Sequence, residues 1–398
     1  MTECFTGSFT QQEPIPEDAI ARAVEVMRSG RLHRYNLVGD EPGEVSLLEA
    51  EFAEAMGAKY CLAVASGGYA LACALRAVGV KPGDKVLTNA FTLAPVPGAI
   101  ASVGAVPLFV GVTEELVIDL DDLAAKADRA KVLMLSHMRG HICDMDRLMA
   151  ICDTAGVTVI EDCAHTMGAR WRGTPSGRHG IAGCYSTQTY KHLNSGEGGL
   201  LVTDDDELAA RAVMLSGSYM LYERHLAAPG AEAFAELRYD TPNVSGRMDH
   251  LRAAILRPQL ARLSQQCAAW TERYRAVEEG LRDTPGLTLV ERPEAEDFVG
   301  SSIQVLLLDW SEAAIAEVLR RCAARGVELK WFGAEPTGFT SRYDSWRYVR
   351  SERMPATDRV LRAILDTRLP LTFSLDDCRL IARIIRAEVA AIHQAGPA

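Results

Sequence analysis

A single lysine, Lys191, lies between two apolar segments in surroundings that suit carbonyl chemistry. Segment 181–186 precedes it and segment 200–203 follows it, so we expect two strands joined by a polar turn. A glycine cluster at 196–199 lets the backbone pass close to another group. Because a lysine held near packed strands loses hydration, its pKa falls and its neutral amine becomes a nucleophile toward carbonyls. The alternative is an exposed lysine on a hairpin, the commonest environment for this residue type.

A pair of acidic residues, Glu161 and Asp162, ends another apolar segment earlier in the chain. Residues 157–160 predict a buried strand, and open α/β sheets bind ligands at the carboxyl ends of their strands. A buried carboxylate needs a cationic partner. The pyridinium nitrogen of pyridoxal phosphate is such a partner, and this cofactor needs an acid there to act as an electron sink. Asp162 and Lys191 are therefore interpreted as contacting the two ends of one pyridoxal phosphate.

Five short motifs follow one another along the chain. They are Ser66-Gly67-Gly68-Tyr69, Glu161-Asp162-Cys163-Ala164-His165, Ser186 ahead of Lys191, Gly196-Glu197-Gly198-Gly199, and Arg247-Met248-Asp249-His250. In this order they resemble the DegT–DnrJ–StrS family of sugar aminotransferases, which depend on pyridoxal phosphate. The resemblance extends over residues 20–390, nearly the whole chain. Several ordered motifs in one chain are far more specific than any single one.

The resemblance implies the aspartate-aminotransferase fold. This is an α/β fold with a mostly parallel seven-stranded sheet in a large domain and a small α+β domain at the C-terminus. We expect the large cofactor-binding domain, with an N-terminal arm, over residues 1–258 and the small domain over residues 259–398. Apolar segments that alternate with helical patterns over residues 60–155 independently predict a doubly wound, largely parallel sheet. The resemblance also implies a homodimer with shared active sites.

The resemblance assigns a role to each candidate site residue. Lys191 would bind the cofactor covalently and then move the proton between substrate carbon and cofactor. Asp162 would keep the pyridine nitrogen protonated, and His165 would lie beside the ring near its phenolic oxygen. Ser186 and the backbone amides of Gly67 and Gly68 would bind the phosphate. A strand, a small-residue turn and a helix N-terminus follow one another at those glycines, which suits an anion.

Two positions depart from the family pattern. Where the family often stacks an aromatic residue on the cofactor ring, the aligned residue is Leu93, with Phe91 just before it. Where the second subunit usually lends an asparagine to the phosphate, this chain has Ser245, with Asn243 slightly upstream. The sequence leaves both members of each pair as candidates.

Composition narrows the class of protein. The chain has 398 residues, 48% of them hydrophobic and 24% charged, which indicates a globular protein of two or three domains. The formal charge of −11 argues against general nucleic-acid binding but allows a local basic pocket. Ten scattered cysteines without a C-x-x-C pair argue against zinc, so we expect no metal, and a reducing cytoplasm fits them best. Neither a membrane span nor a secretory signal is predicted.

Two further stretches allow two interpretations each. The basic loop 31–36, with Arg31 and Arg34, is either a solvated connector or an anion-binding loop. Residues 330–348 are dense in aromatic side chains, which suit a sugar or a base but equally a packed loop.

The leading function is transfer of an amino group from glutamate or glutamine to a keto-sugar, expected to be nucleotide-linked, or to a keto-cyclitol. One alternative is a pyridoxal-phosphate-dependent dehydratase or lyase on the same scaffold. Sugar dehydratases of the family replace the lysine with histidine, so Lys191 disfavours this. Another is a catalytically silent regulatory relative, which the intact Lys191, Asp162 and Ser186 disfavour.

The small domain bears on the choice of substrate. Enzymes of this fold that use two amino acids commonly bind the α-carboxylate with a small-domain arginine. The sequence identifies no matching arginine, although Arg342, Arg347 and Arg350 are candidates.

Overall fold

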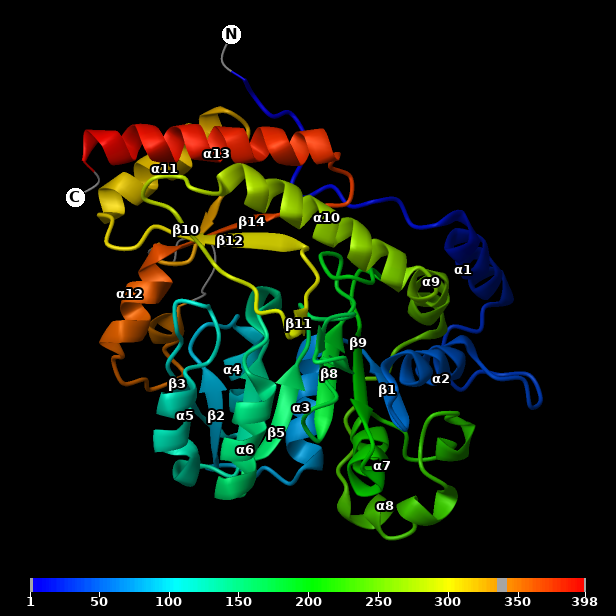
Figure 1. The fold of residues 1–398 in the computed structure, drawn as a ribbon. Helices are drawn as coiled ribbons and strands as arrows, with labels where there is room; N and C mark the ends of the chain where they lie inside the picture. The colour runs from blue at the N-terminus through cyan, green and yellow to red at the C-terminus, as the bar shows by residue number, and fades with distance from the viewer. Residues whose placement is uncertain (1–2, 335–341, 397–398) are drawn as a thin grey trace.

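A seven-stranded β-sheet forms the centre of the larger part of the molecule (Figure 1). The computed structural model describes residues 3–334 and 342–396. The strands are β1 (Tyr60–Val64), β2 (Lys85–Asn89), β3 (Val106–Val110), β4 (Val132–Ser136), β5 (Thr158–Asp162), β8 (Ala182–Ser186) and β9 (Gly199–Thr203). They follow the order β1-β9-β8-β5-β4-β2-β3, and neighbouring strands are parallel except where β9 pairs with β1 and β8. The predicted α/β fold with a mostly parallel seven-stranded sheet is confirmed.

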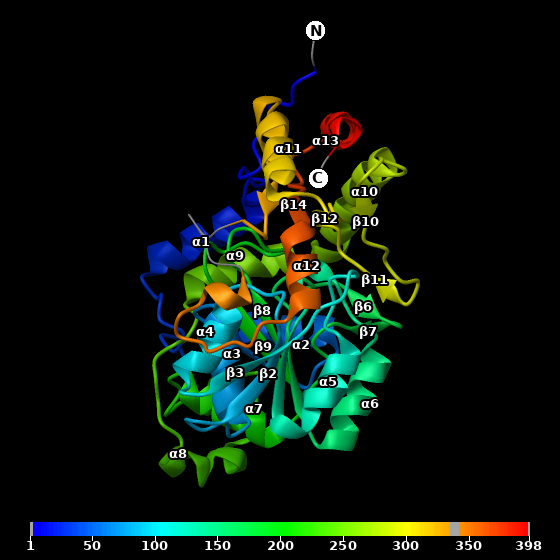
Figure 2. The ribbon, with the colours of Figure 1, turned by 90° about the vertical axis from the view of Figure 1, so that its left-hand side faces the viewer.

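Helices cover both faces of this sheet (Figure 2). One face carries α3 (Gly67–Ala77), α4 (Pro95–Ser102) and α7 (Asp206–Leu215), and the other carries α5 (Leu120–Lys126) and α6 (Met145–Ala155). Successive side chains of a strand point to opposite faces. In β4, Val132 and Met134 therefore pack with the first set of helices, and Leu133 and Leu135 pack with the second. Burial on both faces explains why β4 is a continuous apolar run in the sequence.

Further helices pack on β1 and β9, at one edge of the sheet. These helices are α2 (Glu44–Met56) and α9 (His250–Leu260), and α1 (Glu17–Ser29) packs on α9. The short α8 (Leu237–Asp240) lies near α7. Within the described ranges, no helix has the length and apolarity that a membrane crossing requires.

A second, four-stranded antiparallel sheet, the small sheet, lies above the first in Figure 1. Its order is β10-β12-β14-β13, from β10 (Thr288–Leu289), β12 (Ser302–Leu306), β13 (Lys330–Trp331) and β14 (Ile364–Arg368). It packs with α10 (Leu263–Leu281), α11 (Glu312–Ala324) and α13 (Leu375–Ala395), while α12 (Pro355–Ala363) leads directly into β14. A third sheet, of three strands, combines β6 (Arg170–Trp171), β7 (Thr174–Pro175) and β11 (Glu296–Asp297). The boundary expected at residues 258–259 falls inside α9 and stays a prediction.

The N-terminal segment is extended and packs on the small sheet. Phe5 and Phe9 are buried, and their ring centroids lie 4.9 and 5.0 Å from that of Phe373, in edge-to-face contact. The Phe5 amide also donates a hydrogen bond to the Arg325 carbonyl oxygen at 2.8 Å. The arm expected from the polar composition of this segment is thus anchored by its two aromatic residues.

The basic loop 31–36 contributes a buried ion pair to the core. Arg34 donates to both carboxylate oxygens of Glu49, at 2.9 and 2.8 Å, and neither side chain is exposed. Burial alone would raise the pKa of Glu49, but Arg34 and His225 lower it to about 2, so the carboxylate stays ionised. The anion-binding interpretation of the loop is therefore wrong for Arg34, because Glu49 on α2 already occupies its guanidinium.

Replacing Glu49 with alanine is expected to destabilise the protein by about 3–5 kcal/mol, because Arg34 would remain buried without a counter-charge. The matched control is Glu207→Ala, which removes an acid from an exposed helical pair with Arg211 and should change stability very little. Urea unfolding followed by circular dichroism measures both. Equal stability losses in the two variants would contradict the role of the buried pair.

Candidate active site

Lys191 follows β8 and lies at the carboxyl edge of the central sheet. Its Nζ is 2.8 Å from Nε2 of His165. Burial lowers the pKa of Lys191 to about 7, and the positive charges of Arg139 and Arg368 act in the same direction. Burial likewise keeps the pKa of His165 well below its ordinary value, so this imidazole is neutral. The pair therefore presents an amine that is neutral for part of the time near pH 7, as carbonyl chemistry requires.

Asp162 ends β5 and is buried. Its oxygens accept hydrogen bonds from the Ser136 hydroxyl at 3.0 Å and from the Ala164 amide at 3.1 Å. Ser136 is itself fixed, because its amide donates to Oδ1 of Asn89 at 2.8 Å. Burial raises the pKa of the Asp162 carboxyl despite the opposing charge of Lys191. Such a carboxylate favours a ligand that brings a positive charge, and a protonated pyridine nitrogen is one.

The N-terminus of α3 meets the end of β8. Ser66 caps the helix, since its hydroxyl accepts a hydrogen bond from the Tyr69 amide at 3.1 Å. A Cβ atom at Gly67 would lie 2.8 Å from Cβ of Ser186, so only glycine permits this approach. The amides of Gly67 and Gly68 donate no hydrogen bond to another residue of the described ranges. These free amides, the helix dipole and the Ser186 hydroxyl together suit a phosphate group.

The structure brings all the predicted site residues to one edge of the sheet. Ser186, Gly67 and Gly68 form the anion-binding end, while Lys191, Asp162 and His165 gather next to it. The arrangement fits pyridoxal phosphate, whose phosphate, pyridine nitrogen and aldehyde require these three kinds of group. The role of each residue stays a prediction.

The positions that depart from the family pattern differ in exposure. Phe91 is fully buried and packs edge-to-face on Phe332, with centroids 5.1 Å apart. Leu93 is partly exposed and is therefore the better candidate to cover the cofactor ring. Asn243 and Ser245 are both exposed, and the Asn243 amide donates to the Met214 carbonyl oxygen at 3.0 Å.

Much of the aromatic stretch 330–348 is part of the core. Phe332, Tyr343 and Trp346 are buried in one apolar cluster, which favours the packed-loop interpretation for them, while Tyr348 is exposed. Residues 335–341 of the stretch lie outside the described residues.

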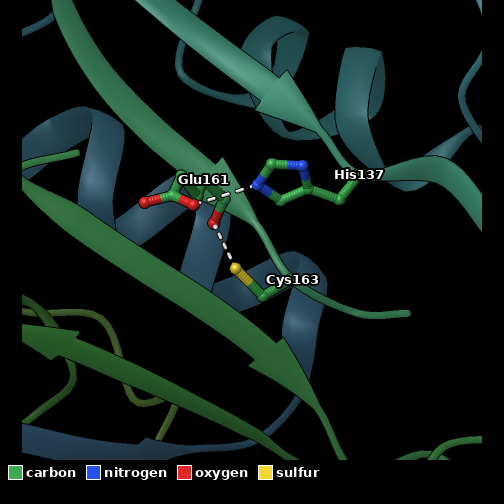
Figure 3. Close-up of side chains that lie close together, drawn as sticks. All are labelled: His137, Glu161 and Cys163. Carbon is green, nitrogen blue, oxygen red and sulfur yellow. Dashed lines mark hydrogen bonds and ion pairs between the residues drawn. The ribbon is translucent and has the colours of Figure 1, made fainter. Parts of the chain in front are cut away.

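His137, Glu161 and Cys163 form a buried group with the composition of a metal site (Figure 3). Their hydrogen bonds indicate a structural role instead of metal binding. One Glu161 oxygen accepts hydrogen bonds from His137 Nε2 at 2.9 Å and from the Gly177 amide at 2.8 Å. The other oxygen accepts from the amides of His179 and Gly180, both at 2.8 Å. Glu161 thus fixes the turn that precedes β8, and through β8 it supports Ser186 and Lys191.

Two arginines next to Lys191 were missed in the sequence. Arg139 follows β4, and its Nη2 forms a 2.7 Å ion pair with Asp366. Arg368 ends β14, and its guanidinium carbon lies 4.0 Å from the ring centroid of Tyr190. No clear strand signal marks β14 in the sequence, because it follows α12 without a turn. Among the earlier candidates, Arg342 pairs with Asp344 at 2.7 Å, and Arg347 and Arg350 are exposed.

Comparison with known proteins identifies the family. The profile of the DegT/DnrJ/EryC1/StrS aminotransferase family matches residues 14–386. The "Pleiotropic regulatory protein" of Geobacillus stearothermophilus is 34% identical over 67% of this chain and 66% of its own length. A "Putative L-glutamine:3-amino-2,3-dideoxy-scyllo-inosose aminotransferase" of Streptoalloteichus tenebrarius is 29% identical over 87% of this chain and 84% of its own length.

Solved structures agree with this family. The crystal structure of 3-amino-5-hydroxybenzoic acid synthase superposes with a TM-score of 0.82 at 27% identity, and covers 96% of this chain and 99% of the synthase. The chain therefore belongs to the DegT/DnrJ/EryC1/StrS aminotransferase family, a family of pyridoxal-phosphate-dependent enzymes.

Proposed function

We propose that this aminotransferase moves an amino group from glutamate or glutamine to the ketone of a sugar or cyclitol ring. The observation that carries the proposal is Lys191, whose pKa is lowered to about 7 beside the buried Asp162 and the N-terminus of α3. The names of relatives that act on inososes support a ring ketone as acceptor. The dehydratase alternative gains no support, because the lysine is present.

The residues of the site divide the chemistry among themselves. When bound, pyridoxal phosphate supplies an electron sink for the carbon that carries the nitrogen. The neutral amine of Lys191 would take the proton from that carbon and deliver it to the cofactor. His165, 2.8 Å away, orients the amine, and Asp162 keeps a positive charge on the pyridine nitrogen. Ser186, Gly67 and Gly68 hold the phosphate end.

We further propose a homodimer. Large apolar side chains are exposed on the loops and helices around residues 27–38 and 219–244. They include Met27, Leu32, Val38, Tyr219, Met220, Leu226, Tyr239 and Val244. The two segments touch, because the Tyr35 hydroxyl contacts Ser218 and lies 2.7 Å from His225 Nε2, and exposed apolar groups that gather on neighbouring segments favour a protein interface. Sedimentation velocity at low micromolar concentration tests this, and a fully active monomer would contradict it. None of the ten cysteines, all of which lie in the described ranges, forms a disulfide, which agrees with a reducing cytoplasm.

The acceptor class is tested by a competition assay with glutamate or glutamine as donor. The acceptors are scyllo-inosose, nucleotide-linked keto-sugars, pyruvate and oxaloacetate, and mass spectrometry detects the products. A site built for ring hydroxyls rejects ligands that lack them, so we expect kcat/KM for one ring ketone to exceed that for pyruvate by about 100-fold or more. A higher kcat/KM for a simple keto acid would make this an ordinary amino-acid aminotransferase.

A further inference from the structure

A small cavity adjoins Lys191 beside the N-terminal arm. Its lining combines residues 12–16 of the arm with Lys191 and His192 of the segment after β8, and with Gln266 and Trp270 of α10. The volume of the cavity is about 40 Å³. A water molecule needs roughly 10–15 Å³ of such space, so the cavity has room for about three.

The polar groups of this lining are not equally satisfied. The Asn194 amide donates to Gln259 Oε1 at 2.9 Å, and Gln259 Nε2 donates to the Asn194 carbonyl oxygen at 2.8 Å. In contrast, His192 Nδ1 and Gln266 Oε1 are buried and have no hydrogen-bond partner among the described residues. An unpaired buried polar atom costs stability, so two such atoms at one cavity indicate a bound polar molecule.

The ring of His192 has a fixed orientation. Its Nε2 lies 3.2 Å from the Ser301 hydroxyl, and the ring packs edge-to-face on Trp270 with centroids 5.0 Å apart. Burial, together with the charge of Lys191, lowers the pKa of His192 to about 3, so the imidazole is neutral and carries one N–H. When the Ser301 hydroxyl donates to Nε2, that N–H is at Nδ1. His192 then offers a donor to the cavity, and Gln266 offers an acceptor.

Water complements these two atoms. It accepts a hydrogen bond from Nδ1–H of His192 and donates one to Oε1 of Gln266, which gives it the minimum of two polar partners that a buried water needs. Sites for substrates and cofactors have volumes of roughly 300 Å³ or more, so a cavity of about 40 Å³ excludes molecules of that size.

Transamination consumes water at a carbon next to Lys191. The donor half-reaction forms a double bond between the substrate carbon and the nitrogen. Water adds its oxygen to that carbon and the carbon–nitrogen bond breaks. Both hydrogens of the water end on the nitrogen, so the products are a ketone and an amine. The attacked carbon is the one whose proton Lys191 takes, so it lies within reach of a cavity that Lys191 lines.

We propose that His192 and Gln266 bind a water molecule beside Lys191, and that this molecule hydrolyses the carbon–nitrogen double bond of the donor half-reaction. The proposal rests on the proposed function, because it concerns the same reaction. His192 and Gln266 are positioning residues, since they act through the water. The N-terminal arm forms part of the wall of this water site.

Crystal structures of the wild-type holoenzyme and of Gln266→Met test the site without turnover. Methionine has nearly the length of glutamine, but its sulfur is only a weak acceptor. We expect an ordered water within hydrogen-bond distance of His192 Nδ1 and Gln266 Oε1 in wild type, and none there in the variant. A wild-type structure in which no water bridges these two atoms would overturn the proposal.

Rapid-quench measurements with L-glutamate and its 2-deuterated form test what the water does. We expect Gln266→Met to slow the release of 2-oxoglutarate about 10- to 100-fold, because the attacking water is misplaced. Proton removal, followed by the absorbance of the cofactor, should stay within about twofold of wild type and keep its deuterium isotope effect. The isotope effect on the release of 2-oxoglutarate should fall toward one, since the addition of water then limits the rate.

The matched control is Gln265→Met, the same substitution at an exposed neighbour on α10 outside the lining of the cavity. We expect it to behave as wild type. His192→Phe is a second test, because it removes Nδ1 and keeps an aromatic ring beside Trp270. It should separate the two rates as Gln266→Met does. Equal slowing of proton removal and of 2-oxoglutarate release in the folded variants would show a structural role and overturn the proposal.

The proposed function and the water site fail in different experiments. If wild type transfers no amine to any ring ketone, the proposed function fails. The crystal structures and the half-reaction with glutamate then still decide whether His192 and Gln266 hold the water.

Discussion

Replacing Lys191 with alanine is expected to lower transamination by at least about 10⁴-fold and to leave no cofactor that borohydride can fix to the chain. The lysine supplies both the covalent attachment and the mobile proton, and among the described residues no second lysine contacts His165. Mass spectrometry of peptides after reduction measures the attachment, and single-turnover spectroscopy measures the rate. Lys85→Ala, at an exposed lysine that begins β2, is the control and should keep both. A reduced adduct on any other lysine would contradict the assignment.

The reactivity of Lys191 in the apoprotein is expected to depend on pH. Its pKa of about 7 lies far below the ordinary lysine value, so its amine loses the proton as pH rises through 7. The neutral share increases from about one tenth at pH 6 to about nine tenths at pH 8. The rate at which Lys191 captures a carbonyl compound should rise over this window and then level off. A rate that keeps rising up to pH 10 would show an ordinary, hydrated lysine.

Asp162→Asn is expected to slow the half-reaction with the amino donor by about 10²- to 10⁴-fold while leaving the cofactor attached to Lys191. The amide has the shape of the carboxylate but no charge, so it does not hold the pyridine nitrogen protonated, and the electron sink is lost. Stopped-flow absorbance with L-glutamate measures the rate, and borohydride reduction confirms attachment. The combination of slow chemistry and intact attachment separates this variant from Lys191→Ala.

The control for Asp162→Asn is Asp153→Asn, an exposed acid near the end of α6. We expect its rate to match wild type. A rate within a few-fold of wild type in Asp162→Asn itself would show that the carboxylate does not serve the pyridine nitrogen.

The sequence predicted the central sheet because each of its strands is a short apolar run between turn residues. Asp162 could be found because it ends such a run, where parallel strands present their carboxyl ends to ligands. Ser186 was identified only through the family resemblance. Arg368 could not, since β14 follows α12 without a turn to mark its start. Arg139 also escaped detection, because nothing in the residue type indicates a positive φ angle.

Charge alone misplaced Arg34. A basic loop is usually solvated, whereas Arg34 is buried because it pairs with Glu49 of α2. The two residues meet only in the folded chain. The aromatic residues Phe332 and Tyr343 raised the same difficulty: their types suit a ligand or a core equally, and only the packing of the small sheet decides between them.

The anchoring of Phe5 and Phe9 on the small sheet constrains how the chain folds. Their partner Phe373 lies near the other end of the sequence, and Gln11 also accepts a hydrogen bond from Thr372. During synthesis the segment around Phe5 leaves the ribosome long before Phe373, so it reaches its place only after the residues between them have been made. Contacts of such long sequence separation slow folding, because a large loop must close before they form. Both sheets are made of segments nearer in sequence, so each can assemble before the N-terminal segment docks.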